Sequence, residues 1–182
     1  MVFVPEQTRQ ALQPFDIKQR VFCQGAVAAY CRFYQLDFEQ DFKHTQHSCG
    51  YFDVASYRVV AHSYLVPKAH GVVWILHGYL EHSGLYRHII PILLAANFSV
   101  VIYDLPAHGL SSGTRASIVS FNEYQAVLEH LIGYFKPHLP QPWLAIGQST
   151  GGAILMDYVL SKHAQQQISV FDRLFLLAPL VY

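Results

Sequence analysis

One segment carries the strongest structural signal in the chain: Trp143-Leu144-Ala145-Ile146-Gly147-Gln148-Ser149-Thr150-Gly151-Gly152. Its first four residues are apolar and predict a buried strand, and the residues after it predict a helix that ends near His163. Between strand and helix lies the pattern Gly-x-Ser-x-Gly. The bare pattern arises by chance in about one chain in twenty of this length, so its position between the two elements gives it weight.

The serine of this pattern is a candidate nucleophile. At a strand-to-helix turn of this kind, Ser149 is held in a strained conformation with its hydroxyl above the carboxyl edge of the sheet. Positions 147 and 151 are expected to require glycine, because neighbouring backbone would clash with a side chain at either position. The start of the following helix offers free N–H groups, so the backbone N–H of Thr150 is a candidate oxyanion-hole donor. The alternative is a serine in an ordinary tight turn.

Apolar runs and helical patterns alternate along most of the chain. Continuous apolar runs are typical of strands that are covered on both faces. The alternation predicts an α/β fold, an open and mostly parallel sheet with helices on both faces. The predicted strands are Tyr57–Leu65, Val72–Leu76, Ser99–Tyr103, Trp143–Ile146 and Phe171–Leu180. Three helices are predicted. The first covers Leu85–Ala96, and the last ends near His163. The second follows a capping box at Ser120-Phe121-Asn122-Glu123 and reaches Phe135.

The N-terminal quarter gives a weaker signal. Residues 1–47 are interpreted as a helical extension, with one helix expected between Asp16 and Tyr34 on an imperfect apolar face that includes Phe22. Residues 48–182 are interpreted as the N-terminal part of a hydrolase domain. The first residues have neither the basic nor the apolar region of a signal peptide.

Composition narrows the functional classes. The 182 residues carry 12 basic and 12 acidic side chains, 52% are hydrophobic and 13% are charged. This balance excludes a disordered chain and an electrostatic nucleic-acid binder. No segment is predicted to span a membrane, and peripheral membrane contact stays open. Three cysteines without a Cys-x-x-Cys pair predict buried thiols in a reducing compartment, so we expect a cytoplasmic protein.

A second motif, His77-Gly78-Tyr79-Leu80-Glu81-His82-Ser83-Gly84, follows the strand Val72–Leu76. A loop at the carboxyl end of that strand faces the same crevice as Ser149. The backbone N–H of Tyr79 is therefore a candidate second oxyanion-hole donor. For the side chains of His77, Glu81 and His82, loop-shaping hydrogen bonds are favoured over catalytic roles.

With these motifs the sequence resembles the α/β hydrolases, specifically the monoacylglycerol lipase and lysophospholipase-like (serine aminopeptidase-like) branch. The resemblance covers about residues 51–182. It rests on three ordered blocks, His77-Gly78-x-x-Glu81-His82-Ser83-Gly84-x-Tyr86, Asp104-x-x-x-His108-Gly109-x-Ser111-x-Gly113 and Gly147-x-Ser149-x-Gly151-Gly152. The resemblance implies Ser149 as nucleophile and the N–H groups of Tyr79 and Thr150 as oxyanion donors. Gln148, Thr150 and Tyr79-Leu80 depart from the residues common in the family, and a bulky Tyr79 would narrow the acyl pocket.

A serine nucleophile needs a base and an orienting carboxylate, which follow the serine along the chain in this fold. After Ser149 the chain contains Asp157, Asp172 and one histidine, His163. Asp157 and His163 lie on the helix that Ser149 opens, pointing away from the site, and Asp172 lies at the far end of the last strand. The preferred interpretation is the N-terminal portion of a longer hydrolase, incomplete at the C-terminal end, with the cap and last strands absent. A short binding protein is the alternative.

The predicted function is hydrolysis of a small-molecule acyl ester through an acyl-enzyme on Ser149, with a monoacylglycerol or lysophospholipid as favoured substrate. Two alternatives are a hydrolase of non-lipid esters, thioesters or peptides and a non-catalytic binding module. No cofactor is expected. The spacing His44-x-x-His47-x-Cys49 is compatible with a metal, but no second cluster completes a tetrahedral set, so no metal site is predicted.

Overall fold

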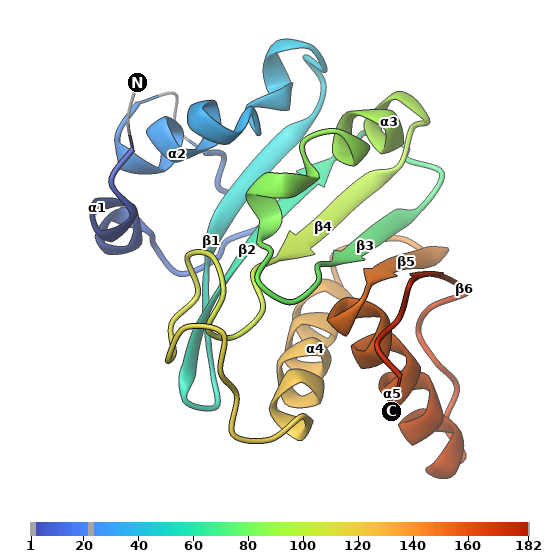
Figure 1. Cartoon of the computed structure of the whole chain (residues 1–182). Helices are drawn as coiled ribbons and strands as arrows, with labels where there is room; N and C mark the ends of the chain where they lie inside the picture. The colour runs from blue at the N-terminus through green and yellow to red at the C-terminus, as the bar shows by residue number, and fades with distance from the viewer. Residues whose placement is uncertain (1–2, 22–23, 182) are drawn as a thin grey trace.

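The computed structural model describes residues 3–21 and 24–181. Their strands form one sheet in the order β1-β2-β4-β3-β5-β6 (Figure 1). The strands are β1 (Gln46–Val54), β2 (Tyr57–Leu65), β3 (Val72–Leu76), β4 (Ser99–Tyr103), β5 (Trp143–Gln148) and β6 (Arg173–Leu177). Strands β4, β3, β5 and β6 run parallel, whereas β2 is antiparallel to both β1 and β4. The predicted α/β class with a mostly parallel sheet is confirmed.

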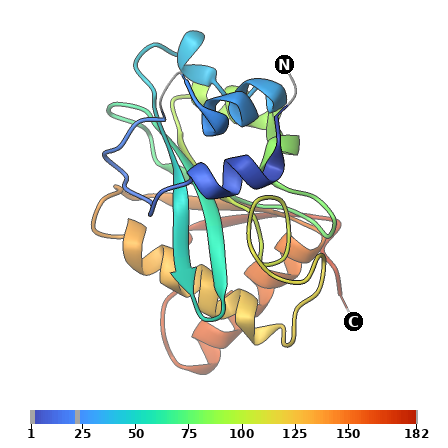
Figure 2. The same ribbon diagram turned by 90° about the vertical axis from the view of Figure 1, so that its left-hand side faces the viewer.

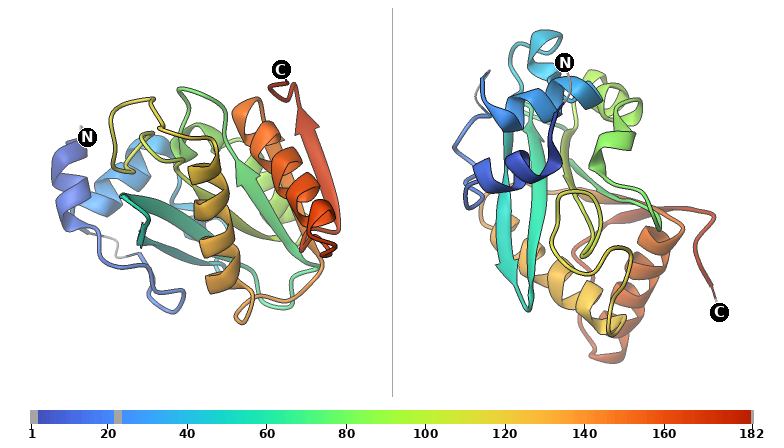
Figure 3. Two further views of the ribbon diagram at one scale, coloured as in Figure 1. Left: turned by 90° about the horizontal axis from the view of Figure 1, so that it is seen from below. Right: turned by 60° about the vertical axis from the view of Figure 1, so that its left-hand side comes forward.

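Helices cover both faces of the sheet (Figure 3). They are α1 (Pro5–Ala11), α2 (Ala26–Tyr34), α3 (Ile89–Ala95), α4 (Asn122–Phe135) and α5 (Thr150–Ala164), with short 3₁₀ helices η1 (Phe38–Gln40) and η2 (Ser83–Tyr86). Alternate residues of β3 point to opposite faces. Val72, Trp74 and Leu76 join the core under α4 and α5, while Val73 and Ile75 join the core under α2 and α3. Because both faces are buried, the central strands are wholly apolar.

The N-terminal part differs from its prediction. The expected helix between Asp16 and Tyr34 is wrong in its first half, because α2 begins at Ala26 after Gly25, whose φ of 91° lies in the left-handed region. Asp16 instead forms a turn in which its Oδ1 accepts a hydrogen bond from Lys18 N at 2.9 Å. Phe22, part of the predicted face, lies outside the described residues. Figure 2 shows α1 and α2 on one side of the β1–β2 hairpin, and α2 contacts both α1 and η2.

Two local predictions also change. The predicted capping box at Ser120 is wrong, because Ser120 and Glu123 do not exchange side-chain-to-backbone hydrogen bonds. Ser120 Oγ accepts from Asn122 N at 3.3 Å. Glu123 Oε2 accepts from Val119 N at 3.3 Å and from the Tyr57 hydroxyl at 2.7 Å. Strand β1, for which no strand was predicted, pairs with β2 along its whole length.

Strand β6 forms one edge of the sheet, and β1 forms the other. In β6, residues Phe175, Leu176 and Leu177 are 51%, 37% and 51% exposed, whereas the other parallel strands are buried. In the part of the chain that the structure describes, no helix has the length and apolar character needed to cross a bilayer.

Candidate active site

Ser149 occupies the turn between β5 and α5. Its φ of 46° and ψ of −111° are a conformation that a residue with a Cβ rarely adopts. Such a residue costs about 1–3 kcal/mol and persists only where the surroundings enforce it. Here the end of β6 enforces it, because Ser149 N donates to Leu177 O at 2.9 Å and Leu180 N donates to Ser149 O at 3.0 Å.

Backbone lies against both glycines that flank Ser149. A Cβ on Gly147 would lie 2.7 Å from the carbonyl oxygen of Gly151. A Cβ on Gly151 would overlap the carbonyl of Leu76 at the end of β3. The helix can start this close to the strands only because neither position carries a side chain, as the sequence predicted.

The loop after β3 runs beside Ser149, since a Cβ on Gly78 would lie 3.4 Å from the Cβ of Ser149. The adjacent residue is Tyr79, whose side chain is turned outward and donates from its hydroxyl to Ala116 O at 3.0 Å. Thr150 is buried as the first residue of α5. Among the described residues, neither the N–H of Tyr79 nor that of Thr150 donates a hydrogen bond. One free backbone donor therefore belongs to the residue after Ser149, and a second belongs to the residue after Gly78, in the loop that runs beside Ser149.

A polar network around Glu81 holds this loop to the turn. Glu81 Oε2 accepts from Gly78 N at 2.9 Å and from the Tyr86 hydroxyl at 2.7 Å, and Glu81 Oε1 accepts from Gln148 Nε2 at 3.1 Å. Burial and the hydrogen bond to Glu81 raise the pKa of Tyr86. The carboxylate thus links the backbone next to Tyr79 with the residue before Ser149.

His77 joins the same loop to the block that begins at Asp104. Leu105 N donates to His77 Nε2 at 2.8 Å, so the ring proton lies on Nδ1 and is donated to Gly78 O, also at 2.8 Å. Burial lowers the pKa of His77 to about 4, which keeps the ring neutral. His82 Nδ1 accepts from Gly84 N at 3.2 Å. The loop-shaping interpretation of His77, Glu81 and His82 is confirmed.

Asp104 completes the connection between the three sequence blocks. Its buried carboxylate accepts from Ser83 N and Leu110 N, each at 2.7 Å. Ser111 Oγ donates to Asp104 O at 2.7 Å. Direct hydrogen bonds therefore join the loops after β3 and β4, and Glu81 extends the network to β5.

The residues that follow Ser149 do not approach it as acid or base. Asp157 and His163 lie on α5, with His163 in its last turn. Asp172 Oδ2 accepts from Trp143 N at 2.9 Å, at the opposite end of β5 from Ser149. Within residues 3–21 and 24–181, no side chain forms a hydrogen bond with Ser149 Oγ.

Comparisons with known proteins agree with this geometry. The family described as serine aminopeptidase S33 matches residues 67–182. A monoacylglycerol lipase of Mycolicibacterium smegmatis is 35% identical over 48% of this chain and 32% of its own length. A monoglyceride lipase of Homo sapiens is 31% identical over 63% of this chain and 36% of its own length. The chain thus spans about a third of the length of the curated relatives it matches.

Solved structures share the fold at lower identity. A monoacylglycerol lipase of Paleococcus ferrophilus matches with a TM-score of 0.56 and 24% identity over 70% of this chain and 43% of its own. A putative lipase of Acinetobacter baumannii matches with a TM-score of 0.59 and 17% identity over 89% of this chain and 48% of its own. Since the family match covers most of the chain, the protein belongs to the serine aminopeptidase S33 family of α/β hydrolases.

Proposed function

We propose that this chain provides the nucleophile and the oxyanion hole of a serine hydrolase that cleaves acyl esters through an acyl-enzyme on Ser149. The observation that carries the proposal is the strained Ser149 backbone with two free N–H groups beside it. Strain of this kind is stored at functional sites, where it places a reacting group.

In the proposed reaction, Ser149 Oγ attacks the ester carbonyl carbon and gives its proton to a base. The N–H groups of Tyr79 and Thr150 donate to the oxyanion of the tetrahedral intermediate, and the alcohol leaves with a proton. Water then attacks the acyl-enzyme in the same way and releases the fatty acid. We place the base and its orienting carboxylate outside these 182 residues, because the described residues bring no histidine to Ser149.

The favoured substrate is a monoacyl lipid, a monoacylglycerol or a lysophospholipid. The support is that the two curated relatives described above are named monoacylglycerol lipase and monoglyceride lipase. Another relative is a phospholipase of Bacillus subtilis, 31% identical over 48% of this chain and 34% of its own length. The family description, an aminopeptidase, keeps peptides, non-lipid esters and thioesters as the alternative class. A non-catalytic binding module is the second alternative.

A fluorophosphonate probe tests the proposal, because it labels only an activated serine. The product of the complete reading frame should be labelled, and Ser149→Ala should abolish labelling while the control Ser161→Ala, on the same helix, leaves it unchanged. Absence of labelling in that product would favour the binding module. Rates on a monoacylglycerol, a lysophospholipid, a short-chain ester, a thioester and an aminoacyl amide then identify the substrate class.

A further inference from the structure

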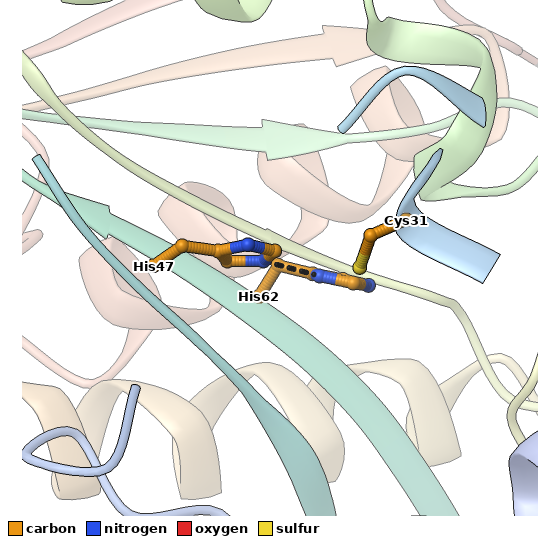
Figure 4. Close-up of side chains that lie close together, drawn as sticks. All are labelled: Cys31, His47 and His62. Atoms are coloured by element: carbon orange, nitrogen blue, oxygen red, sulfur yellow. Dashed lines mark hydrogen bonds between the residues drawn. The ribbon is translucent and has the colours of Figure 1, made fainter. Parts of the chain in front are cut away.

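Three buried side chains from separate elements meet on the face of the sheet opposite α4 and α5. Cys31 comes from α2, His47 from β1 and His62 from β2 (Figure 4). One ligand atom from each residue lies within 4.8 Å of the others, and all three residues are at most 2% exposed. A thiol and two imidazoles are the ligand types that Zn²⁺ prefers.

Each imidazole has one nitrogen turned toward the cluster and a partner on the other. His47 Nε2 and His62 Nδ1 face each other at 2.9 Å. His47 Nδ1 lies 3.7 Å from Glu39 Oε1, and His62 Nε2 lies 3.7 Å from Cys49 Sγ. Metal-bound histidines hold their second N–H with an outer partner; for His62 this partner is Cys49, at hydrogen-bond distance for sulfur, and for His47 the nearest carboxylate, Glu39, lies just beyond that distance.

The donor set suits a divalent cation. A bound divalent cation would displace the proton of the Cys31 thiol and be held by the resulting thiolate together with one nitrogen from each imidazole.

The ligand atoms would have to adjust for a metal to bind, with Cys31 Sγ, which lies within 4.8 Å of the histidine nitrogens, moving up to about 1 Å closer. In a tetrahedral zinc site the nitrogen ligands lie about 3.3 Å apart and a nitrogen and a sulfur about 3.6 Å apart. The two histidine nitrogens at 2.9 Å would therefore separate by a few tenths of an ångström as the proton between them is replaced by the metal.

A path to solvent is present. A cavity of about 260 Å³ is lined by Cys31 and His47, by the acidic side chains of Asp37 and Glu39 and by one basic side chain, Arg32. Two carboxylates against one guanidinium leave the lining negative, and the cavity leaves space for a water molecule at a fourth coordination position.

We propose that Cys31, His47 and His62 form a binding site for Zn²⁺ or a similar thiolate-preferring divalent cation, with Glu39 and Cys49 as outer partners. The site would tie α2 to the β1–β2 hairpin and is separate from Ser149. It replaces the sequence-based expectation of no metal site. The spacing His44-x-x-His47-x-Cys49 contained one ligand, but His44 is exposed, and the other two ligands come from distant segments.

Metal binding is measured on the product of the complete reading frame, stripped with a chelator and titrated with Co²⁺ and then Zn²⁺. The expected result is one equivalent of Co²⁺ per chain with a sulfur-to-cobalt charge-transfer band, displaced by Zn²⁺ and not by Mg²⁺, which prefers oxygen ligands. Zn²⁺ should also raise the midpoint of thermal unfolding. No binding, or a cobalt spectrum without the sulfur band, would overturn the proposal.

Two matched cysteine variants identify the ligand. Cys31→Ala should abolish the sulfur band and weaken Co²⁺ binding by more than 100-fold. Cys49→Ala should keep the band and weaken binding at most 10–100-fold, as outer partners do. His44→Ala should bind like the unmodified protein, and circular dichroism checks that each variant folds. Retention of the band in a folded Cys31→Ala variant, or its loss only in Cys49→Ala, would contradict the assigned ligand set.

Discussion

Gln148 and Glu81 are in direct contact, with Gln148 Nε2 donating to Glu81 Oε1 at 3.1 Å. Gln148 ends β5 immediately before Ser149, and Glu81 lies in the loop that follows β3. The contact fixes the loop that carries the Tyr79 N–H relative to the turn that carries Ser149. The carboxylate also accepts from Gly78 N and the Tyr86 hydroxyl, so one side chain holds three donors.

Replacing Glu81 should therefore impair both stability and serine reactivity. Glu81→Ala removes an acceptor from three donors, of which the Tyr86 hydroxyl keeps Gln148 Oε1 at 3.1 Å as an alternative. We expect a loss of about 1–3 kcal/mol of unfolding free energy and slower fluorophosphonate labelling. Glu81→Gln keeps an acceptor oxygen and should be intermediate in both. Urea unfolding and the labelling rate measure the two effects. Labelling of Glu81→Ala at the unmodified rate would argue against a positioning role.

The proposed oxyanion donor at Thr150 is a backbone group, which makes two substitutions at this residue informative. Thr150→Ala keeps the N–H and should leave hydrolysis by the complete protein largely intact. Thr150→Pro removes the N–H at the first position of α5, where helices tolerate proline. We expect it to reduce the rate on the order of 10²–10³-fold or to disrupt the turn itself. Circular dichroism separates these outcomes, and equally severe losses in both variants would assign the role to the Thr150 side chain.

The strained backbone of Ser149 predicts that relieving the strain at this position raises stability. Ser149→Gly and Ser149→Ala both remove the hydroxyl and should both abolish labelling. Glycine adopts a φ of 46° with a ψ of −111° without steric cost, whereas alanine keeps the strain. We expect Ser149→Gly to be more stable than Ser149→Ala by about 1 kcal/mol in urea unfolding. A less stable glycine variant would show that this backbone conformation carries little strain.

Stability should fall in mild acid because of His77. Its folded pKa of about 4 lies below its ordinary value of 6.5, so the unfolded chain binds more protons between these two pH values. The contribution of His77 is full above pH 6.5 and decreases as the pH falls to about 4, by a total of about 3 kcal/mol. Urea unfolding between pH 7 and pH 4 should show that the unfolding free energy of His77→Gln falls less with decreasing pH than that of the unmodified protein. Parallel curves for the two proteins would contradict this assignment.

The 182 residues expressed alone should be catalytically inert and should self-associate. A neutral serine hydroxyl is a weak nucleophile without a base. The edge strand β6 presents Phe175 and Leu177, both half exposed, and unpaired edges of this kind join other chains. Phe175→Lys should reduce the association seen by size-exclusion chromatography. A monodisperse monomer that hydrolyses a short-chain ester in a Ser149-dependent manner would overturn both parts of the prediction.

Local patterns were enough to predict the central strands, the helices that cover them and the strand-to-helix turn at Ser149. The strands β3, β4 and β5 are short apolar runs because each is buried on both faces. The Gly-x-Ser-x-Gly turn requires its glycines because backbone lies against them, and the whole strand–turn–helix signal fits within ten residues. Such signals depend on neighbours in sequence and on the side-chain period of each element.

Other features became visible only in three dimensions. The Glu81–Gln148 contact joins residues 67 positions apart, and no local pattern encodes such a pair. The cluster of Cys31, His47 and His62 depends on the β1–β2 register, which pairs Cys49 with His62, and on the position of α2. Long-range pairing and packing decide these positions, since the free energy that fixes them comes from contacts between distant segments.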